Sequence, residues 1–161
     1  MSRKKNGASK KNKLEGSLNL DDLPRSMCCL CLDTNMFRGS VSLTRLPEAL
    51  KWLNLQNNML SGRVDLTCLP AALSKLHLNQ NEFSGETDFS QLPKGLQLLN
   101  VSYTSLSGRI VAQNRTRIFE IHNSNVELVE WYKTRTPEFN RRVNISSMIT
   151  FSLPKKFLPS L

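Results

Sequence analysis

The 161-residue chain lacks any long apolar run, since no segment approaches the roughly 20 consecutive apolar residues that cross a membrane. Its first residues also contain no apolar stretch of the kind that directs secretion. We therefore expect a cytoplasmic or nuclear protein with no membrane association, and not a secreted one. The sequons at Asn100, Asn114 and Asn144 are then expected to be unused.

Histidine is scarce, and the residue patterns that carry catalysis are missing. The only histidines are His77 and His122, and no Ser or Cys nucleophile lies at a diagnostic spacing from either. The sequence contains no Gly-rich phosphate loop, no paired metal motif and no nucleophile elbow. We expect a protein that is not an enzyme and that binds no cofactor and no small-molecule substrate.

The chain has only four cysteines, and three of them are close together. Cys28 and Cys31 have the Cys-x-x-Cys spacing that zinc sites use, with Cys29 between them. There is only one such pair, however, and no histidine accompanies it. We expect these residues to pack as small side chains on a strand, with no metal site and, in a reducing compartment, no disulfide.

What the sequence does contain is a repeat. Five glycines follow one another at intervals of 23 residues: Gly16, Gly39, Gly62, Gly85 and Gly108. Fixed self-similarity at a period of roughly 20 to 50 residues indicates a solenoid of stacked repeats. In a solenoid each coil contacts only its neighbours, so both ends of the stack need a cap.

One repeat unit reads LPxxLxxLxLxxNxhSGxxxhxx, where h is apolar, and the units begin at Leu23, Leu46, Leu69 and Leu92. The proline after each of these leucines fixes φ and favours turns or extended chain over a long helix. Three further apolar columns are Met27, Leu50, Leu73, Leu96; Leu30, Leu53, Leu76, Leu99; and Leu32, Leu55, Leu78, Val101. Asparagine follows at Asn35, Asn58 and Asn81, and Thr104 takes its place in the fourth unit.

The two ends of the repeat array are incomplete units. Residues 14–20 match the second half of a unit, which predicts an opening half coil. Phe119, Ile121, Ser124 and Val126 repeat the spacing of Leu53, Leu55, Asn58 and Leu60, but 20 residues after Leu99 in place of 23. This spacing predicts a fifth, shortened coil.

Alternation within the unit predicts the core. In Leu53-Asn54-Leu55, neighbouring side chains of a strand point to opposite faces, so the leucines face inward and Asn54 faces outward. A short strand buries its apolar side only when stacked coils, about 4.8 Å apart, pair their strands into a parallel sheet. The expected core is a column of leucines.

These units resemble the leucine-rich repeat family over residues 14–128. The resemblance implies an α/β-type repeat solenoid, mostly strand and coil, that is right-handed and has a short-stranded parallel sheet on its concave face. It also implies a structural ladder in which Asn35, Asn58 and Asn81 satisfy buried backbone groups where the coil bends. The Ser-Gly motif is similar to plant-type repeats, and the Asp-Leu-Thr-x-Leu-Pro phrase is similar to short leucine-rich repeat proteins of kinetoplastid protists.

The family usually binds proteins through the outward positions of the concave face. By this resemblance, the expected protein-binding residues are Lys51, Trp52, Asn54, Gln56, Asn57, Lys75, His77, Asn79, Asn100 and Tyr103. Exposed Trp52 and Tyr103 fit an interaction anchor, because Trp and Tyr are enriched among hot spots; alternatively they are ordinary exposed aromatics, or the C-terminal tail covers them. We predict an interaction module or scaffold for a protein partner.

The net charge of +9 is concentrated in the tails: residues 1–13 carry +6, residues 129–161 carry +4 and residues 14–128 carry −1. The N-terminal stretch is predicted to be a disordered basic tail, with binding of acidic partners or nuclear targeting as alternatives. A nearly neutral solenoid offers no basic patch for phosphate. The alternative function, a structural subunit of a protein–nucleic-acid assembly, therefore depends on Arg3, Lys4, Lys5, Lys10, Lys11 and Lys13.

Residues 129–161 depart from the repeat and are predicted to be a C-terminal cap or a docking tail. The stretch from Val143 to Leu153 alternates apolar and polar residues with one interruption, as an edge strand does. Such a strand, with Trp131 and Tyr132, would cover the last coil. The alternative is a flexible segment that docks onto a partner.

Overall fold

The structure is a computed structural model that describes residues 13–112 and 117–130. The predicted basic tail as far as Asn12 and the predicted cap or docking tail from Trp131 onward lie outside the described residues. Five of the six basic residues considered for nucleic-acid binding also lie outside them, and the sixth, Lys13, is exposed.

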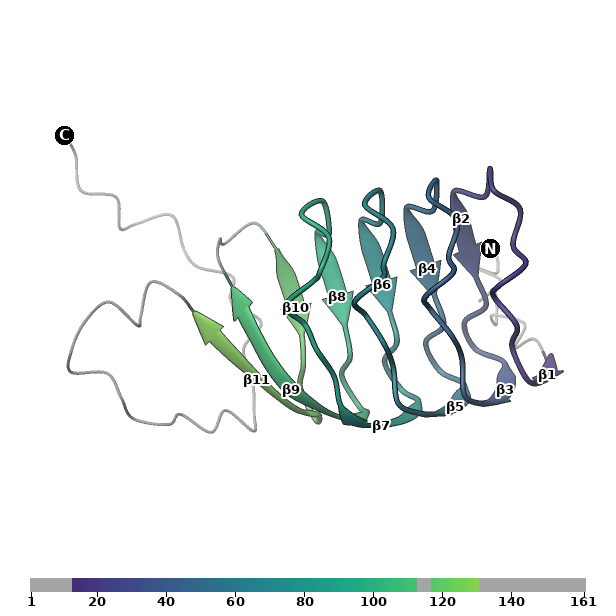
Figure 1. The fold of residues 1–161 in the computed structure, drawn as a ribbon. Coiled ribbons are helices and arrows are strands. Elements are labelled where there is room, and N and C mark those ends of the chain that lie inside the picture. Colours follow the sequence, from purple (N-terminus) through teal and green to yellow (C-terminus); the bar gives the residue numbers. More distant parts are fainter. Residues whose placement is uncertain (1–12, 113–116, 131–161) are drawn as a thin grey trace, which may run out of the picture.

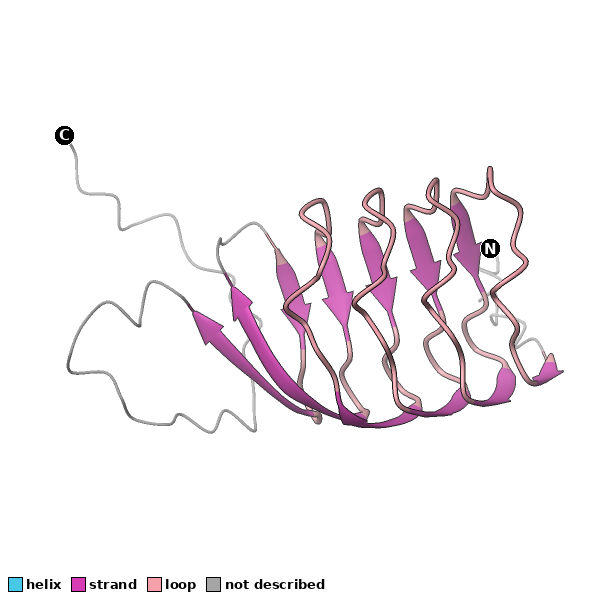
Figure 2. Cartoon of the chain, in the orientation of Figure 1, coloured by secondary structure: helices cyan, strands magenta, loops and turns pink. Residues whose placement is uncertain are grey.

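The described residues form strands and loops, and they contain no helix (Figure 2). In chain order the strands are β1 (Glu15–Gly16), β2 (Cys29–Cys31), β3 (Met36–Gly39), β4 (Trp52–Asn54), β5 (Met59–Gly62), β6 (Lys75–His77), β7 (Glu82–Glu86), β8 (Leu98–Asn100), β9 (Ser105–Ala112), β10 (Ile118–Glu120) and β11 (Asn125–Glu130). The described part of the fold is therefore all-β.

The strands form two parallel sheets, because each full coil contributes one strand to each. The first sheet has five strands in the order β10-β8-β6-β4-β2, and the second has six in the order β1-β3-β5-β7-β9-β11. Figure 1 shows the coils side by side, from β1 at one end of the stack to β11 at the other. The result is a β-solenoid of about five turns, and β1, which precedes every strand of the first sheet, belongs to the predicted opening half coil.

Pairing in the first sheet follows the sequence repeat. Leu30 pairs with Leu53 and Leu53 pairs with Leu76, each 23 residues further along the chain. The last step is shorter, because Leu99 pairs with Phe119, 20 residues further on. The predicted fifth coil, shortened by three residues, is confirmed.

The second sheet uses a different offset. Its strands pair residues 21 apart, as Glu15 with Met36, and 18 apart at the last step, as Ser107 with Asn125. Each glycine consequently pairs with an apolar residue two positions before the next glycine: Gly16 with Phe37, Gly39 with Leu60, Gly62 with Phe83, Gly85 with Leu106 and Gly108 with Val126. All five apolar partners are buried. The second sheet is therefore displaced by two residues per coil relative to the first.

The core lies between the two sheets and consists mainly of the leucine columns. In the middle coils Leu53, Leu55, Leu76 and Leu78 have no exposed surface. At both ends the equivalent residues are only partly buried: Leu30 and Leu32 in the first full coil, and Phe119 and Ile121 in the last. Burial is therefore complete only for coils that have a neighbour on each side.

The expected α/β character is wrong for the described residues, and the Leu-Pro segments show why. The amides of Met27, Leu50, Leu73 and Leu96 donate to the carbonyls of Pro24, Pro47, Pro70 and Pro93, three residues earlier, at 2.9 or 3.0 Å. Each bond closes one turn, and the next strand of the first sheet begins two residues later. Proline has no N–H group, and the chain has no length left for a helix before the strand.

The asparagine column joins neighbouring coils. The Nδ2 group of Asn58 donates to the carbonyls of Leu55 in its own coil and Leu32 in the preceding coil, at 3.1 and 3.0 Å. Its Oδ1 atom accepts from the backbone amide of Phe37. Asn81 makes the same set of bonds one coil later, and Asn35 bonds to Leu32 and Asp33 and accepts from Leu14. These side chains occupy backbone groups that leave the strand pairing where the coil bends.

Hydroxyl groups take the place of asparagine in the last two coils. The Oγ1 atom of Thr104 donates to the Val101 carbonyl at 2.7 Å, and the Oγ atom of Ser124 donates to the Ile121 carbonyl at 2.5 Å. A hydroxyl has one donor where an amide has two, so each makes the bond within its own coil.

Candidate functional site

The outer face of the first sheet carries two rows of side chains that run from coil to coil. The upstream row, at the first position of each strand, is Cys29, Trp52, Lys75, Leu98 and Ile118. The downstream row, at the third position, is Cys31, Asn54, His77, Asn100 and Glu120. The buried middle residues separate the two rows, because alternate side chains of a strand point to opposite faces.

The upstream row is the more accessible, and it is rich in apolar and aromatic surface. Trp52 is 38% exposed and Ile118 is 55% exposed, while Leu98 is half-buried. The ammonium of Lys75 lies 5.7 Å from the centre of the Trp52 ring, within the range of a cation–π contact. Lys51, which precedes β4, is also exposed. Predicted residues Lys51, Trp52 and Lys75 therefore form one accessible group.

The downstream row differs from the expectation of freely exposed contact residues. Asn54 and Asn100 are buried, with 7% and 6% of their surface exposed. The Asn54 Oδ1 atom accepts from the amide of Gln56, and the Asn100 amide group donates to the Glu120 carboxylate. In-register neighbours cover these side chains from both sides, so an outward direction does not make a polar residue accessible.

His77 lies between Asn54 and Asn100 in this row and is half-buried. Burial lowers the pKa of His77, Glu120 opposes this shift by raising the pKa, and the positive charge of Lys75 lowers it further. The imidazole is therefore predominantly neutral at pH 7. It offers a partner one hydrogen-bond donor and one acceptor in place of a positive charge.

The predicted contact residues beyond the strands are mixed in exposure. Gln56 is half-buried and Asn79 is buried at 8% exposure, with an Oδ1 atom that has no hydrogen-bond partner within the described structure. Asn57 is exposed, and Tyr103 is 51% exposed and packs edge-on against the His122 ring at 5.0 Å between centroids. The structure thus keeps Asn57 and Tyr103 accessible but covers Asn79.

Asn57 and Tyr103 share an unusual backbone conformation. They belong to a column with φ between 52° and 58°, one per coil, made of Thr34, Asn57, Gln80, Tyr103 and Asn123. A left-handed residue reverses the chain direction sharply, and here it directly precedes the ladder position. The orientation of these loop side chains is therefore determined by a bend that is repeated in every coil.

The cysteines are all free and exposed. Partial burial raises the pKa of Cys31, with smaller increases from Asp33 and Cys29, so this thiol is less readily ionised than an ordinary one. Within residues 13–112 and 117–130, no three His, Cys, Asp or Glu side chains are arranged to hold a metal ion.

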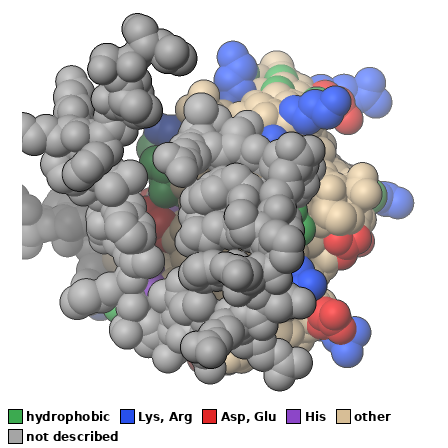
Figure 3. All heavy atoms as spheres, turned by 90° about the vertical axis from the view of Figure 1, so that its left-hand side faces the viewer, with side chains coloured by type: hydrophobic (Ala, Val, Ile, Leu, Met, Phe, Trp, Pro, Cys, Tyr) green, Lys and Arg blue, Asp and Glu red, His purple; other side chains and the backbone are tan. Residues whose placement is uncertain are grey.

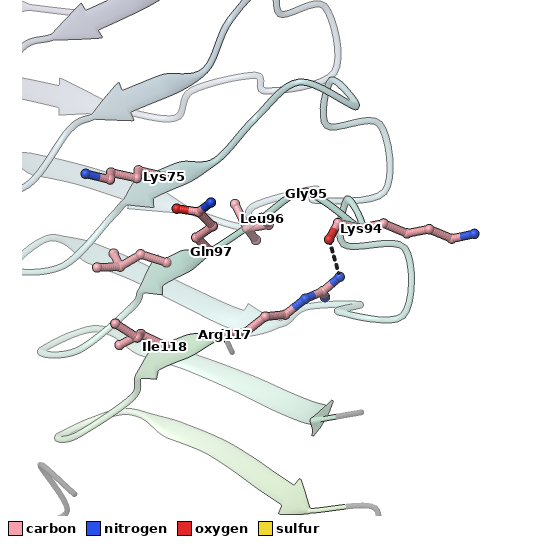
Figure 4. A pocket seen from close by; sticks show the side chains of 8 residues that line it. Lys75, Lys94, Gly95, Leu96, Gln97, Arg117 and Ile118 are labelled. Atoms are coloured by element: carbon pink, nitrogen blue, oxygen red, sulfur yellow. Dashed lines mark hydrogen bonds between the residues drawn. The ribbon is translucent and has the colours of Figure 1, made fainter. Parts of the chain in front are cut away.

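A hollow of about 490 Å³ lies at the edge of the first sheet where β6, β8 and β10 begin. Its lining includes Lys75, Lys94, Gln97, Leu98, Arg117 and Ile118. Figure 4 shows Lys75, Gln97 and Ile118 extending to one side of the sheet edge, while Lys94 and Arg117 extend to the other. The Arg117 guanidinium donates to the Lys94 carbonyl at 2.9 Å.

The sequence-based list did not include Ile118 or the hollow beside it. A signal was present: Phe119 had been aligned with Leu53, so the residue before it is equivalent to Trp52. The shortened fifth coil hid this equivalence, because the outward columns were followed only at the 23-residue spacing.

Away from this edge the surface carries charges of both signs. In the end-on view of Figure 3, basic and acidic side chains of the described residues appear close together. On the second sheet the exposed residues Arg109 and Glu127 form an ion pair at 3.1 Å. Exposed pairs of this kind contribute little stability, about 0 to 1 kcal/mol.

No protein-family model, no curated protein and no solved structure matches this chain. In the part of the chain that the structure describes, no helix has the length and hydrophobicity needed to cross a membrane.

Proposed function

We propose that the protein is a non-enzymatic interaction module that binds a protein partner on the outer face of the first sheet. The observation that carries the proposal is the upstream row, in which Trp52, Lys75 and Ile118 are accessible on three strands of one sheet. Aromatic and basic side chains are common energetic anchors of protein interfaces. Strand pairing fixes their spacing, so binding requires little ordering of the backbone.

The class of solenoid is part of this proposal. We infer a right-handed leucine-rich repeat architecture in which the first sheet is the concave binding face. The Leu-x-Leu strands, the Leu-Pro turns and the hydrogen bonds of Asn58 and Asn81 support this class. The second sheet, with its Ser-Gly strands, would then form part of the opposite face.

A matched pair of variants tests which sheet binds. Trp52 on the first sheet and Met36 on the second are 38% and 40% exposed, so each can be replaced by alanine at similar cost to the fold. Affinity capture from cell lysate with quantitative mass spectrometry should identify partners retained by the wild type and by Met36→Ala. Trp52→Ala should reduce their recovery at least about tenfold, as expected for a hot-spot residue.

Equal recovery with both variants would contradict binding at this face. Thermal denaturation of both variants is the control for folding, and we expect the two midpoints to remain close to that of the wild type.

A further inference from the structure

We infer that the upstream edge of the last coils binds an extended acidic peptide that carries an apolar residue between acidic ones. This inference rests on the proposed function, because it assigns a partner chemistry to part of the same face. The site is the hollow lined by Lys75, Lys94, Gln97, Leu98, Arg117 and Ile118.

Charge complementarity favours an acidic partner. Three cations line the hollow, and no acidic residue of the described chain does. The acidic residues of the solenoid lie elsewhere: Glu82, Glu86 and Glu127 on the second sheet, Asp65 and Asp88 in the loops after it, and Asp33 and Glu120 at or beyond the downstream row. The nearly neutral net charge of the repeats therefore conceals a local basic edge.

The cations lie on both sides of an apolar centre. Figure 4 shows Lys75 on the same side of the sheet edge as Ile118, and Lys94 and Arg117 on the opposite side. Ile118 is 55% exposed beside the half-buried Leu98. A peptide that crosses this edge can bury an apolar side chain on Ile118 and Leu98, with carboxylates directed to Lys75 on one side and Arg117 on the other.

Arg117 is held in a position suited to this role. Its guanidinium is anchored by the bond to the Lys94 carbonyl, which lies across the hollow on the preceding coil. A guanidinium has five N–H donors, so this bond uses only part of its capacity. A carboxylate can then be bound by donors whose orientation is already determined.

The hollow itself depends on a small residue. Gly95 lines it, where the two preceding coils have Ala49 and Ala72 at the equivalent position. A Cβ atom at Gly95 would meet only the Ala71 carbonyl oxygen, at 3.5 Å, which is an ordinary contact. Gly95 is therefore not required by close packing, and its absence of a side chain widens the hollow.

The lining fits a peptide better than single-stranded nucleic acid. Single-stranded nucleic acid is bound largely by stacking its bases on aromatic side chains, and no aromatic residue lines this hollow. The exposed apolar surface of Ile118 instead suits an aliphatic side chain.

Fluorescence anisotropy with the full-length protein tests the inference. The probe is a fluorescein-labelled, end-blocked hexapeptide of sequence EELLEE, and the comparison peptide is QQLLQQ. We expect the acidic peptide to bind at least about tenfold more tightly than the neutral one, and its affinity to fall at least about tenfold in Lys75→Gln/Arg117→Gln. Arg38→Gln/Arg63→Gln removes the same charge from exposed sites on and next to the second sheet and should leave the affinity unchanged.

Three results would overturn the inference: no preference for the acidic peptide, an equal loss in both double variants, or equally strong competition by a six-nucleotide oligothymidylate. Lys75→Gln alone, at an exposed side chain without an assigned backbone bond, keeps the test valid if the Arg117 substitution disturbs folding. If the Trp52 variant still loses captured partners while peptide binding ignores Lys75 and Arg117, the proposed function stands and only this inference fails.

Discussion

At the scale of single residues, the five repeat glycines differ in what surrounds them. All have positive φ values between 82° and 132°, a conformation that L side chains rarely adopt. A Cβ atom at Gly39 would meet nothing within 4 Å, whereas one at Gly108 would lie 2.4 Å from the Thr87 carbonyl oxygen and 3.0 Å from the Phe89 ring. Gly39 thus reports backbone strain alone, and Gly108 reports strain together with a steric clash.

We predict that Gly39→Ala lowers the free energy of unfolding by about 1 kcal/mol, the cost of the backbone conformation. Gly108→Ala should lower it by about 3 kcal/mol, because the backbone oxygen and the ring must also move. Denaturant titration of both variants measures the difference. Equal losses would show that the close approach at Gly108 has no energetic effect.

The ladder residue Asn58 joins two coils through three carbonyls and one amide. Asn58→Leu should destabilise the protein by roughly 1 to 3 kcal/mol, because buried backbone groups lose their partners. Asn58→Thr should cost less, since Thr104 occupies the same column and bonds within its own coil. Denaturation midpoints that match the wild type for Asn58→Leu would refute the structural role of the ladder.

At the scale of elements, the position of a strand in the stack determines how much its central leucine contributes. Leu76 on β6 has no exposed surface, whereas Leu30 on the terminal strand β2 is only partly buried. The same substitution therefore removes different amounts of buried area.

Leu76→Ala is expected to cost about 2 to 5 kcal/mol, the range for emptying a closed core position. Leu30→Ala should cost clearly less, because the missing methyl groups were partly hydrated already and no closed cavity forms. Urea denaturation of the two variants provides the comparison, and similar losses would mean that the end of the stack is as closed as its middle.

The sequence predicts the strands of the first sheet well, because Leu53 and Leu76 mark both the core and the register. It does not predict the register of the second sheet: the 23-residue period shows which positions are equivalent, but not which positions pair. Nor does alternation predict that Asn54 and Asn100 are covered, since it gives the direction of a side chain and not the width of its neighbours. The hollow beside Ile118 was missed because it depends on a shortened coil and on Gly95.

At the scale of the whole molecule, a repeating stack should tolerate the removal of one complete coil. Deletion of residues 63–85 joins Gly62 to Glu86 and so restores the natural Gly-Glu junction of Gly85 and Glu86. We predict a shorter protein that still unfolds cooperatively, at a lower temperature, because stability in such stacks is approximately a sum over coils and their interfaces.

Deletion of residues 63–84 is the matched control, since it removes 22 residues and shifts all later positions by one. A one-residue slip directs core side chains to the opposite face of each strand. Circular dichroism during heating should show a cooperative transition for the 23-residue deletion and none for the control. Two identical unfolding curves would contradict a fold held in register by its period.

The different offsets of the two sheets affect how substitutions accumulate when coils are copied during evolution. A residue introduced into one ancestral unit and then duplicated would form a straight file across the first sheet, because equivalent positions pair there. On the second sheet the same history would place the copies on a diagonal, two residues further along at every coil. Duplication alone can therefore build a continuous contact surface on the first sheet, whereas the second sheet would need separate substitutions in each coil.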